Sequence, residues 1–408
     1  MNEENQTSNK PKPLEIFLVF LSLGLSSFGG PIAHLGFFNQ ELVIKRKWLN
    51  SQLFSELVAL CQFLPGPSSS QVGLSIGYIK GGFCGALAAW FGFTTPSAII
   101  LIFFGYIYVS YSDVIPFGII HGLKIFAVAI VAQAIWTMGI AFCKDIKCLL
   151  IIVIVGFLII LAPTPLFQFI AIIISGIIGS LVFEISEVKL DRKFEYLVKI
   201  RFALTLLIIF ILLLFLLPIL VNFTANPLLS LIDSFYRAGS LVFGGGHVVL
   251  PLLQTEIVSS GHVTNEAFLA GYGAAQAMPG PLFTFAAYLG TVSVSYPNGV
   301  VGGLLALCAI FIPSFLLVIG ILPFWNELRR IMVFKKAIIG INAAVVGILI
   351  AAFYSPVATN GILSLHDFLA VLVLLTFIHF SKLPIWCLVI FASIECWMFN
   401  DVLNIIMF

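Results

Sequence analysis

The sequence has very little charge. Of its 408 residues only 9% are Asp, Glu, Lys or Arg, whereas 61% are hydrophobic, and the mean hydropathy is +1.13. Soluble domains carry about 25% charged residues, so this composition excludes a soluble domain. The formal net charge of +2 is spread over loops and forms no basic patch, which argues against a nucleic-acid partner.

Patterned cysteines and a nucleotide-binding loop are also missing. The seven cysteines lie mostly within apolar segments without metal-ligand spacing, which favours buried thiols over a disulfide framework or a metal centre. No G-x-x-x-x-G-K-[ST] loop occurs, so direct use of ATP would require a partner. We therefore expect no cofactor and no metal.

What the chain has instead is long apolar runs, such as 149–162, 201–221 and 368–380. A membrane helix needs about 20 such residues, so the longer runs predict full spans and the shorter ones half-helices. Residues 1–13 are polar and are followed by no small-residue cleavage pattern, so we expect a retained cytoplasmic tail. The sequence predicts an all-α polytopic protein of the lipid bilayer with about ten to thirteen membrane segments.

A proline-glycine-proline step occurs twice, each time three residues after a glutamine. Gln62–Pro67 recurs as Gln276–Pro281, 214 residues later (276 − 62). The same residue types in one order at nearly constant spacing indicate an internal duplication. The other matched pairs, at offsets of 215 to 217, are Phe28-Gly29-Gly30 with Phe243-Gly244-Gly245, Glu41 with Glu256, and Pro96-Ser97 with Pro313-Ser314.

Corresponding loops of the two halves differ in whether they carry positive charge. Lys45-Arg46-Lys47 corresponds to the uncharged Ser259-Ser260-Gly261, whereas in a later pair Tyr111-Ser112-Asp113, without Lys or Arg, corresponds to a loop with Arg329, Arg330, Lys335 and Lys336. Because Lys and Arg stay on the cytoplasmic side, the halves are predicted to be inverted-topology repeats. The predicted division is a first repeat over 14–186, a cytoplasmic loop and linking membrane helix over 187–226, and the inverted repeat over 227–408. Residues 14–44 fit either one long helix or a hairpin broken at Gly29-Gly30-Pro31.

Both Pro-Gly-Pro steps lie between apolar stretches too short to cross a bilayer alone, which predicts broken or re-entrant helices at a transporter's substrate site. The alternative is an ordinary helix-ending loop. Proline suits a helix start, and glycine lets a ligand approach the backbone. The hydroxyl and amide donors of residues 68–71 would begin the next helix, where anions are favoured. Leu282, Phe283 and Thr284 follow the second step, so we expect an asymmetric site.

Charged and titratable residues near these steps are further candidates. A charge near mid-membrane costs about 2.5 kcal/mol or more, so Arg237 is a candidate anion ligand, with an interfacial arginine as the alternative. Glu41, Glu256 and His34 are weaker candidates for proton coupling, with solvated carboxylates and a packed histidine as alternatives. The predicted substrate-binding residues are Gln62, Pro65, Gly66, Pro67, Ser68, Ser69, Ser70, Gln71, Arg237, Gly244, Gly245, Gly246, His247, Gln276, Pro279, Gly280 and Pro281.

Several strings resemble the chromate ion transporter family in its long, two-domain form. In the first half they are Phe28–Pro31, Trp48-Leu49, Leu57–Pro67 and Gln71–Gly73, and in the second half Val242–Pro251 and Gly271–Pro281. The similarity runs from about residue 14 to the C-terminus. His262 departs from it, because a tryptophan matching Trp48 is expected there as an interfacial anchor.

The resemblance implies a bacterial inner-membrane protein that exports chromate and confers chromate resistance, with sulfate as the look-alike anion. An inside-negative potential of 100 mV contributes about 2.3 kcal/mol per charge, thus about 4.6 kcal/mol for a departing dianion. Export by uniport or proton antiport is therefore the easier direction, and uptake would need more than two co-transported protons. The oligomeric state stays open, a homodimer included.

Three rival functions are open at this stage. Gly73-Leu74-Ser75-Ile76-Gly77 fits the nucleophile-elbow pattern of hydrolases, but that elbow requires a strand before the serine, whereas here a glycine-rich membrane segment is expected. A carrier of sulfate or another tetrahedral oxyanion would use similar donors. A passive anion channel is the third.

Overall fold

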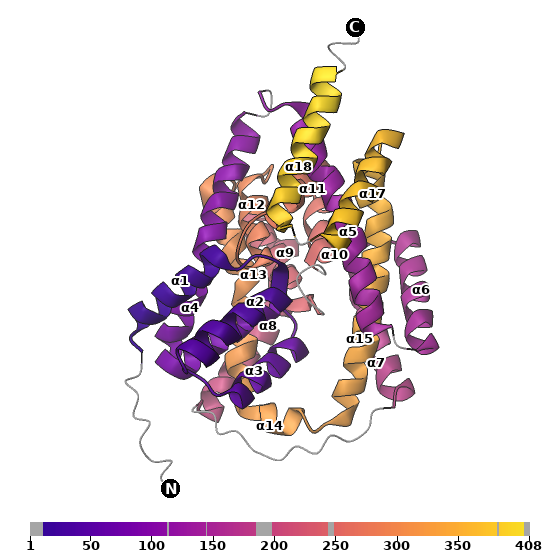
Figure 1. Ribbon diagram of the computed structural model, residues 1–408. Helices are drawn as coiled ribbons and strands as arrows, with labels where there is room; N and C mark the ends of the chain where they lie inside the picture. Colours follow the sequence, from indigo (N-terminus) through magenta and orange to yellow (C-terminus); the bar gives the residue numbers. More distant parts are fainter. Residues whose placement is uncertain are drawn as a thin grey trace.

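A computed structural model describes residues 11–111, 114–143, 145–184, 198–243, 249–381 and 383–403. All regular structure in these ranges is helical (Figure 1). The α-helices are α1 (Pro13–Ser26), α2 (Gly30–Phe38), α3 (Ser51–Phe63), α4 (Ser68–Ser110), α5 (Phe117–Phe142), α6 (Ile146–Leu161), α7 (Pro165–Val182), α8 (Ile200–Thr224), α9 (Pro227–Leu241), α10 (Val249–Leu253), α11 (Asn265–Gln276), α12 (Phe285–Thr291), α13 (Gly299–Ile321), α14 (Trp325–Leu328), α15 (Met332–Ala352), α16 (Thr359–Gly361), α17 (Leu365–Phe380) and α18 (Ile385–Trp397).

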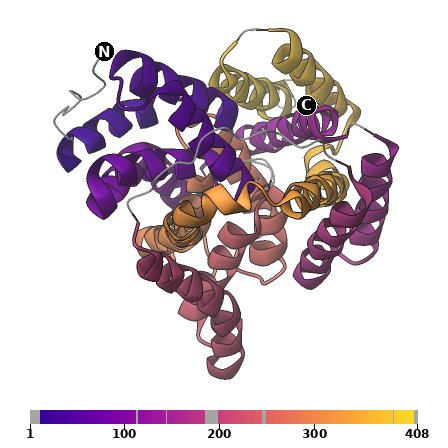
Figure 2. The same cartoon turned by 90° about the horizontal axis from the view of Figure 1, so that it is seen from below.

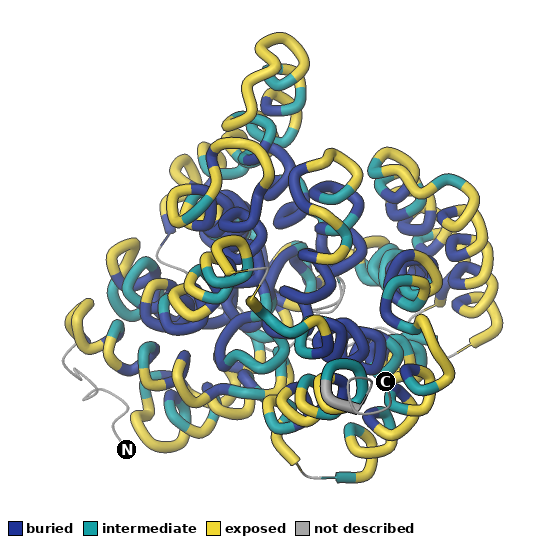
Figure 3. The backbone as a smooth tube through the Cα atoms, turned by 90° about the horizontal axis from the view of Figure 1, so that it is seen from above, coloured by how far each residue is buried: buried dark blue, intermediate teal, exposed yellow. Residues whose placement is uncertain are grey.

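The helices have the length and composition of a membrane protein. Within the described ranges six helices are long and apolar enough to cross a bilayer, and five shorter ones are also apolar. The most apolar of the six is α8. Only 6% of an 18-residue stretch of this helix is buried, and the helix lies at the periphery in Figure 2. Exposed residues line the outer helix faces, while buried residues gather in the middle (Figure 3). Apolar side chains directed outward require lipid as their solvent, which confirms the predicted all-α polytopic fold.

The first apolar segment is a broken hairpin and not one long helix. α1 ends at Ser26 and α2 begins at Gly30, with Gly29 at φ +98° as its N-cap. A positive φ is easy for glycine and costly for other residues, so Phe28-Gly29-Gly30 is where the chain can break. This decides between the two alternatives for residues 14–44.

The glycine-rich part of α4 contains a tight turn. Gly81 and Gly82 leave the helical region, at φ −134° and +62°, so the chain reverses inside α4. Gly77 and Gly85 then lie against each other, because a Cβ on either would clash with the carbonyl oxygen of the other. The glycine spacing therefore produces close packing within one hairpin. Gly290 and Gly302 make the corresponding contact in the second half.

Each half covers the long central helix of the other. α6 and α7 pack against α15, and α17 and α18 pack against α5 (Figure 1). The inner packing is matched too, because α1 lies on α4 as α9 lies on α13. This reciprocal arrangement brings the breaks of both halves to the centre.

Candidate functional site

The four helix breaks meet at two backbone hydrogen bonds. The Gly66 N–H donates to the Val242 carbonyl at 2.7 Å, and the Gly280 N–H donates to the Ser27 carbonyl at 2.8 Å. Each bond joins the Pro-Gly-Pro step of one half to the residue just before Phe-Gly-Gly in the other. The two glycines have φ of +121° and +90°, a region that favours glycine. The repeat thus makes the same backbone contact twice, and we call each of these two contacts a crossing.

The Pro-Ser pair inside α4 or α13 of each half contributes its serine hydroxyl beside the Pro-Gly-Pro glycine of the other half. A Cβ at Gly66 would lie 3.0 Å from Ser314 Oγ and would clash with the Gln71 amide nitrogen. A Cβ at Gly280 would lie 3.1 Å from both Ser97 Oγ and the Phe93 carbonyl oxygen. Sequence reasoning assigned no role to Ser97 or Ser314, although their repetition was visible as Pro96-Ser97 and Pro313-Ser314.

The Gln71 side chain stabilises the first break through its amide group. Its Nε2 donates to the Pro65 carbonyl at 2.6 Å and lies 3.5 Å from Ser314 Oγ, and the residue is fully buried. Among the described residues its Oε1 has no hydrogen-bond partner, and neither has Ser70 Oγ. Phe285 occupies the corresponding position of the second half (71 + 214), so only the first break has an amide brace.

The three serines after Pro67 have different surroundings. Ser68 lines a cavity, whereas Ser69 is buried and its Oγ lies 3.2 Å from His34 Nδ1. The His34 side chain is 1% exposed and packs edge-on against Phe93. His34 therefore supports the start of α4 by packing and hydrogen bonding.

A cavity of about 860 Å³ leads to the first break. Gly29, Gly66 and Ser68 line it, and Arg329 and Lys335 contribute positive charge from the α14–α15 segment. The lining is mostly apolar, and its neutral polar side chains come from α3, α5 and α15, among them Gln52, Ser55, Gln62, Gln133, Thr137 and Asn342. Neutral donors together with two cations can attract an anion.

The two cations of the cavity differ in how they are compensated. Arg329 Nη1 lies 2.6 Å from Glu56 Oε1, and Trp325 Nε1 donates to the other oxygen of Glu56 at 3.1 Å. Lys335 has no carboxylate within 4 Å in the part of the chain that the structure describes. One positive charge therefore exceeds the negative charge on the cavity wall.

The second break is less exposed than the first. Pro279, Gly280 and Pro281 are buried and Gln276 is half-buried with its Nε2 shielded from solvent, whereas at the first break Gln62 is exposed and Pro65 is half-buried. Nearby, α11 packs tightly on α5, because a Cβ at Gly273 would clash with the Leu123 carbonyl oxygen. Lys124 on α5 also lies 3.4 Å from Glu266 on α11. The corresponding α3–α15 contact is where the cavity lies.

Arg237 is neutralised by two carboxylates. Its Nη2 lies 2.9 Å from Asp233 Oδ2 and 2.9 Å from Glu256 Oε2. Glu256 is 6% exposed, so it is a buried ion-pair partner and not the solvated carboxylate expected as the alternative. Arg237 does not line the cavity and its charge is already compensated, so its predicted role as an anion ligand has no support in this geometry.

Glu41 has surroundings unlike those of its counterpart Glu256. It pairs with Lys45 at 3.1 Å and with Arg46 at 2.9 Å at the protein surface. The hydrogen bonds from Arg46 and Lys45 hold the pKa of Glu41 below its ordinary value. A carboxylate kept ionised in this way is poorly suited to carry a proton.

Three further predictions concern Gly244–His247, His262 and Ser75. Gly244, Gly245, Gly246 and His247 lie outside the described residues. His262 is buried and its Nε2 lies 3.0 Å from Ser230 Oγ, so it is an internal residue and not an interfacial anchor. Ser75 is buried within helix α4 and donates to the Gln71 carbonyl at 2.7 Å, which is not the strand–turn–helix context of a hydrolase nucleophile.

Comparison with known proteins agrees with the repeat. The profile of the family described as Chromate transporter matches residues 14–181 and again residues 229–396. An uncharacterized transporter of Methanocaldococcus jannaschii is 27% identical over 368 residues, covering 86% of this chain and 87% of the relative. A chromate transport protein of Pseudomonas aeruginosa is 25% identical, covering 84% of this chain and 81% of its own length.

A chromate transport protein of Cupriavidus metallidurans is also 25% identical, over 83% of this chain and 81% of the relative. No solved structure matches. The two profile matches start 215 residues apart (229 − 14), the offset found between the Phe-Gly-Gly segments. With both halves matched, the chain belongs to the chromate transporter family.

Proposed function

We propose that this protein exports chromate from the cytoplasm as a secondary transporter of the bacterial inner membrane and thereby confers chromate resistance. The observation that carries the proposal is the cavity between the cationic α14–α15 segment and the first Pro-Gly-Pro break. Relatives with the printed name chromate transport protein match most of the chain.

The cavity provides two kinds of interaction for a tetrahedral dianion. Lys335 and Arg329 attract negative charge toward the cavity, and Gln133, Thr137 and Asn342 offer neutral donors along it. Ser68 lines the cavity and begins α4, where unpaired backbone N–H groups and the helix dipole favour an anion. Binding there without a full counter-charge lets the ion leave again.

The expected topology sets the direction of transport. The cavity lies on the side of Arg329, Arg330, Lys335 and Lys336, which the positive-inside rule assigns to the cytoplasm. A potential of 100 mV, inside negative, favours the exit of a dianion by about 4.6 kcal/mol. That free energy sustains a gradient of roughly three decades at 1.36 kcal/mol per decade.

Alternating access follows from the two unequal interfaces. The α3–α15 side is open, whereas α11 is packed on α5 at the matched position. Rocking of the two inverted repeats about their crossed breaks would close the first interface and open the second, as in other inverted-repeat transporters.

The test is chromate flux into inside-out membrane vesicles energised by respiration. In that orientation export appears as accumulation, which we expect to collapse with an uncoupler and to be reduced by unlabelled sulfate. Accumulation of labelled sulfate without accumulation of chromate would assign the cavity to sulfate. No accumulation of either anion above that of control vesicles would refute oxyanion export.

A further inference from the structure

A cluster of ionisable side chains lies around the N-terminal end of α5, far from the cavity. The cavity is lined by α5 from Ile130 to Phe142. His121 lies nine residues earlier (130 − 121), or about 13 Å along the helix axis. Its Nε2 is 3.0 Å from Asp367 Oδ1, and both side chains are almost fully buried.

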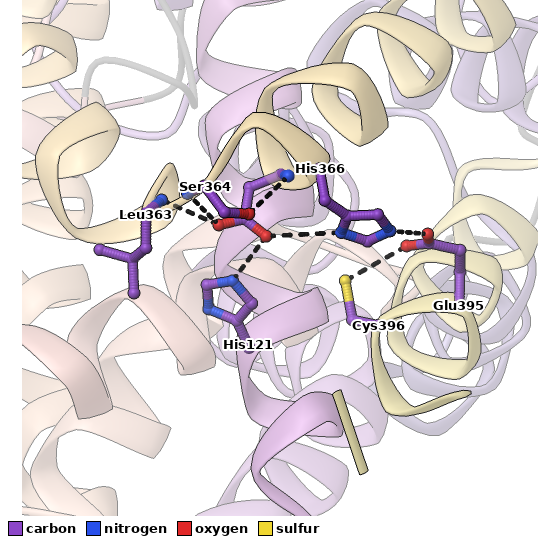
Figure 4. A network of polar contacts seen from close by, with 7 residues as sticks. His121, Leu363, Ser364, His366, Glu395 and Cys396 are labelled. Atoms are coloured by element: carbon purple, nitrogen blue, oxygen red, sulfur yellow. Dashed lines mark hydrogen bonds and ion pairs between the residues drawn. The ribbon is translucent and has the colours of Figure 1, made fainter. Parts of the chain in front are cut away.

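His366 lies between two carboxylates of this cluster. Its Nε2 is 2.6 Å from Glu395 Oε1, and Figure 4 shows the two side chains pointing toward each other. Its Nδ1 faces Asp367 Oδ1 at 3.7 Å, which is too long for a hydrogen bond. The side chains of His366 and Glu395 are 22% and 31% exposed at the surface of the protein, although the Nδ1 atom of His366 is itself shielded.

The cluster holds together the ends of several helices. Asp367 Oδ2 accepts the backbone N–H groups of Leu363 and Ser364 and so caps α17. Cys396 on α18 donates to Glu395 Oε2 at 3.3 Å. Asp401 accepts the Gly118 N–H of α5 at 2.8 Å. Among the described residues, Lys124 of α5 and Glu266 of α11 are further charged groups near this end, and they pair with each other.

The cluster can take up one more proton, at His366 Nδ1. The two short histidine–carboxylate contacts each need one proton, which the Nε2–H form of a neutral imidazole supplies. In that state the cluster of His121, His366, Asp367 and Glu395 has a formal charge of −2. The lone pair of His366 Nδ1 then faces a carboxylate oxygen, and both imidazole Nδ1 atoms lack a partner among the described residues. One added proton at His366 Nδ1 converts this repulsion into an ion pair.

The cluster is mechanically connected to the transport pathway through α5. The end of α5 that holds His121 also closes on α11, where Leu123 meets Gly273 and Lys124 meets Glu266. The other end of α5 lines the cavity with Gln133 and Thr137. A change in how α17 and α18 hold the first turns of α5 therefore acts on the closed interface and on the cavity wall together.

We propose that His366, with Asp367, Glu395 and His121, is a proton-binding site. Its occupancy biases the exchange between the state in which the α3–α15 interface is open and the state in which the α5–α11 interface is open. The ligand is a proton taken from the side opposite the cavity. This inference rests on the proposed export function and adds a proton-antiport component to it. Glu41 and Glu256, the earlier candidates, are both held in ion pairs with cations.

The test is the dependence of chromate flux on the pH inside the lumen of inside-out vesicles, with the membrane potential clamped. Between about pH 5 and 8 we expect the initial rate of the wild type to change about tenfold. His366→Gln keeps an amide donor for Glu395 but binds no proton, so its rate should vary less than about twofold over the same range. His379→Gln, on the exposed last turn of α17, is the matched control and should retain the wild-type profile. A wild-type profile in His366→Gln would overturn the proposal.

A second measurement separates failure of this site from failure of the transport function. The melting temperature of the purified protein in detergent requires no chromate flux. If the folded cluster binds a proton more tightly than the unfolded chain does, the melting temperature depends on pH over the histidine range, and His366→Gln weakens that dependence while His379→Gln does not. Glu395→Gln removes one of the two carboxylates and should shift the pH at which the melting temperature changes. Equal pH dependence in all four proteins would refute the proton site even if chromate is transported, and a lost dependence in His366→Gln without chromate flux would refute only the export function.

Discussion

The Pro65–Pro67 and Pro279–Pro281 breaks make matching backbone contacts in different surroundings. In each, the glycine N–H bonds to a carbonyl of the other half, at 2.7 Å and 2.8 Å. The first break is continued by residues 68–71 and opens on the cavity, while the second is continued by Leu282, Phe283 and Thr284 and is buried. The duplicated backbone provides the crossing, and the side chains around it determine which break can meet an anion.

Substitution of the two glycines should have the largest effect. Gly66→Ala places a Cβ against Gln71 and Ser314 at a φ that costs about 1–3 kcal/mol for a residue other than glycine. We expect at least tenfold lower chromate flux at normal expression, and a loss of similar size for Gly280→Ala, because both crossings are needed. Gly139→Ala, on α5 with open space around it, is the control and should keep its flux. Wild-type flux in both crossing variants would rule out this site.

Lys335 should matter more than its neighbour. Lys335→Ala removes the cavity cation that has no carboxylate within 4 Å among the described residues, so the chromate concentration for half-maximal flux should rise about tenfold, or about 1.4 kcal/mol. Lys336→Ala removes the same charge from a side chain that does not line the cavity and should leave this concentration nearly unchanged. Equal effects of the two substitutions would show that both lysines act only by orienting the protein in the membrane and that Lys335 does not bind the anion.

The equivalent carboxylates Glu256 and Glu41 allow a third comparison. Glu256→Gln removes one of two buried carboxylates from Arg237, which should lower the free energy of unfolding by about 1–3 kcal/mol. The melting temperature in detergent measures this change. Asp233 still pairs with Arg237, so the protein should fold. An unchanged melting temperature would show that the Arg237–Glu256 pair contributes nothing.

Glu41→Gln should have the smallest effect. Its pairs with Lys45 and Arg46 are at the surface, where such pairs contribute less than about 1 kcal/mol. Because these cations lower the pKa of Glu41, its contribution is present above the unfolded pKa of about 4.3 and is lost as pH falls through the folded pKa. Flux near neutral pH should equal that of the wild type. A larger drop in melting temperature than that of Glu256→Gln would reverse the comparison.

The helical membrane fold and the breaks in its helices were accessible from the sequence because they depend on the backbone. Positive-φ glycines, helix-starting prolines and a lack of charge have few structural solutions in a bilayer, so the helix break at Gly66 was predictable, whereas the break at Gly29 was one of two alternatives. The Arg237–Glu256 pair and the His366 cluster were not, because they join residues brought together only by packing between distant helices. Ser97 and Ser314 are intermediate, since their repetition was visible but their contact with the opposite glycine was not.

The most direct test of the account is the accessibility of Gln62 and Gln276, equivalent glutamines on the two sides of the crossing. Each would be replaced by cysteine in a chain whose seven native cysteines have been removed, and treated with a membrane-impermeant thiol reagent in inside-out vesicles. The open cavity predicts that Gln62→Cys is modified and is protected by chromate, and that Gln276→Cys is not modified. Equal modification of the two cysteines, or modification of Gln62→Cys that chromate does not slow, would contradict a substrate site at the first break.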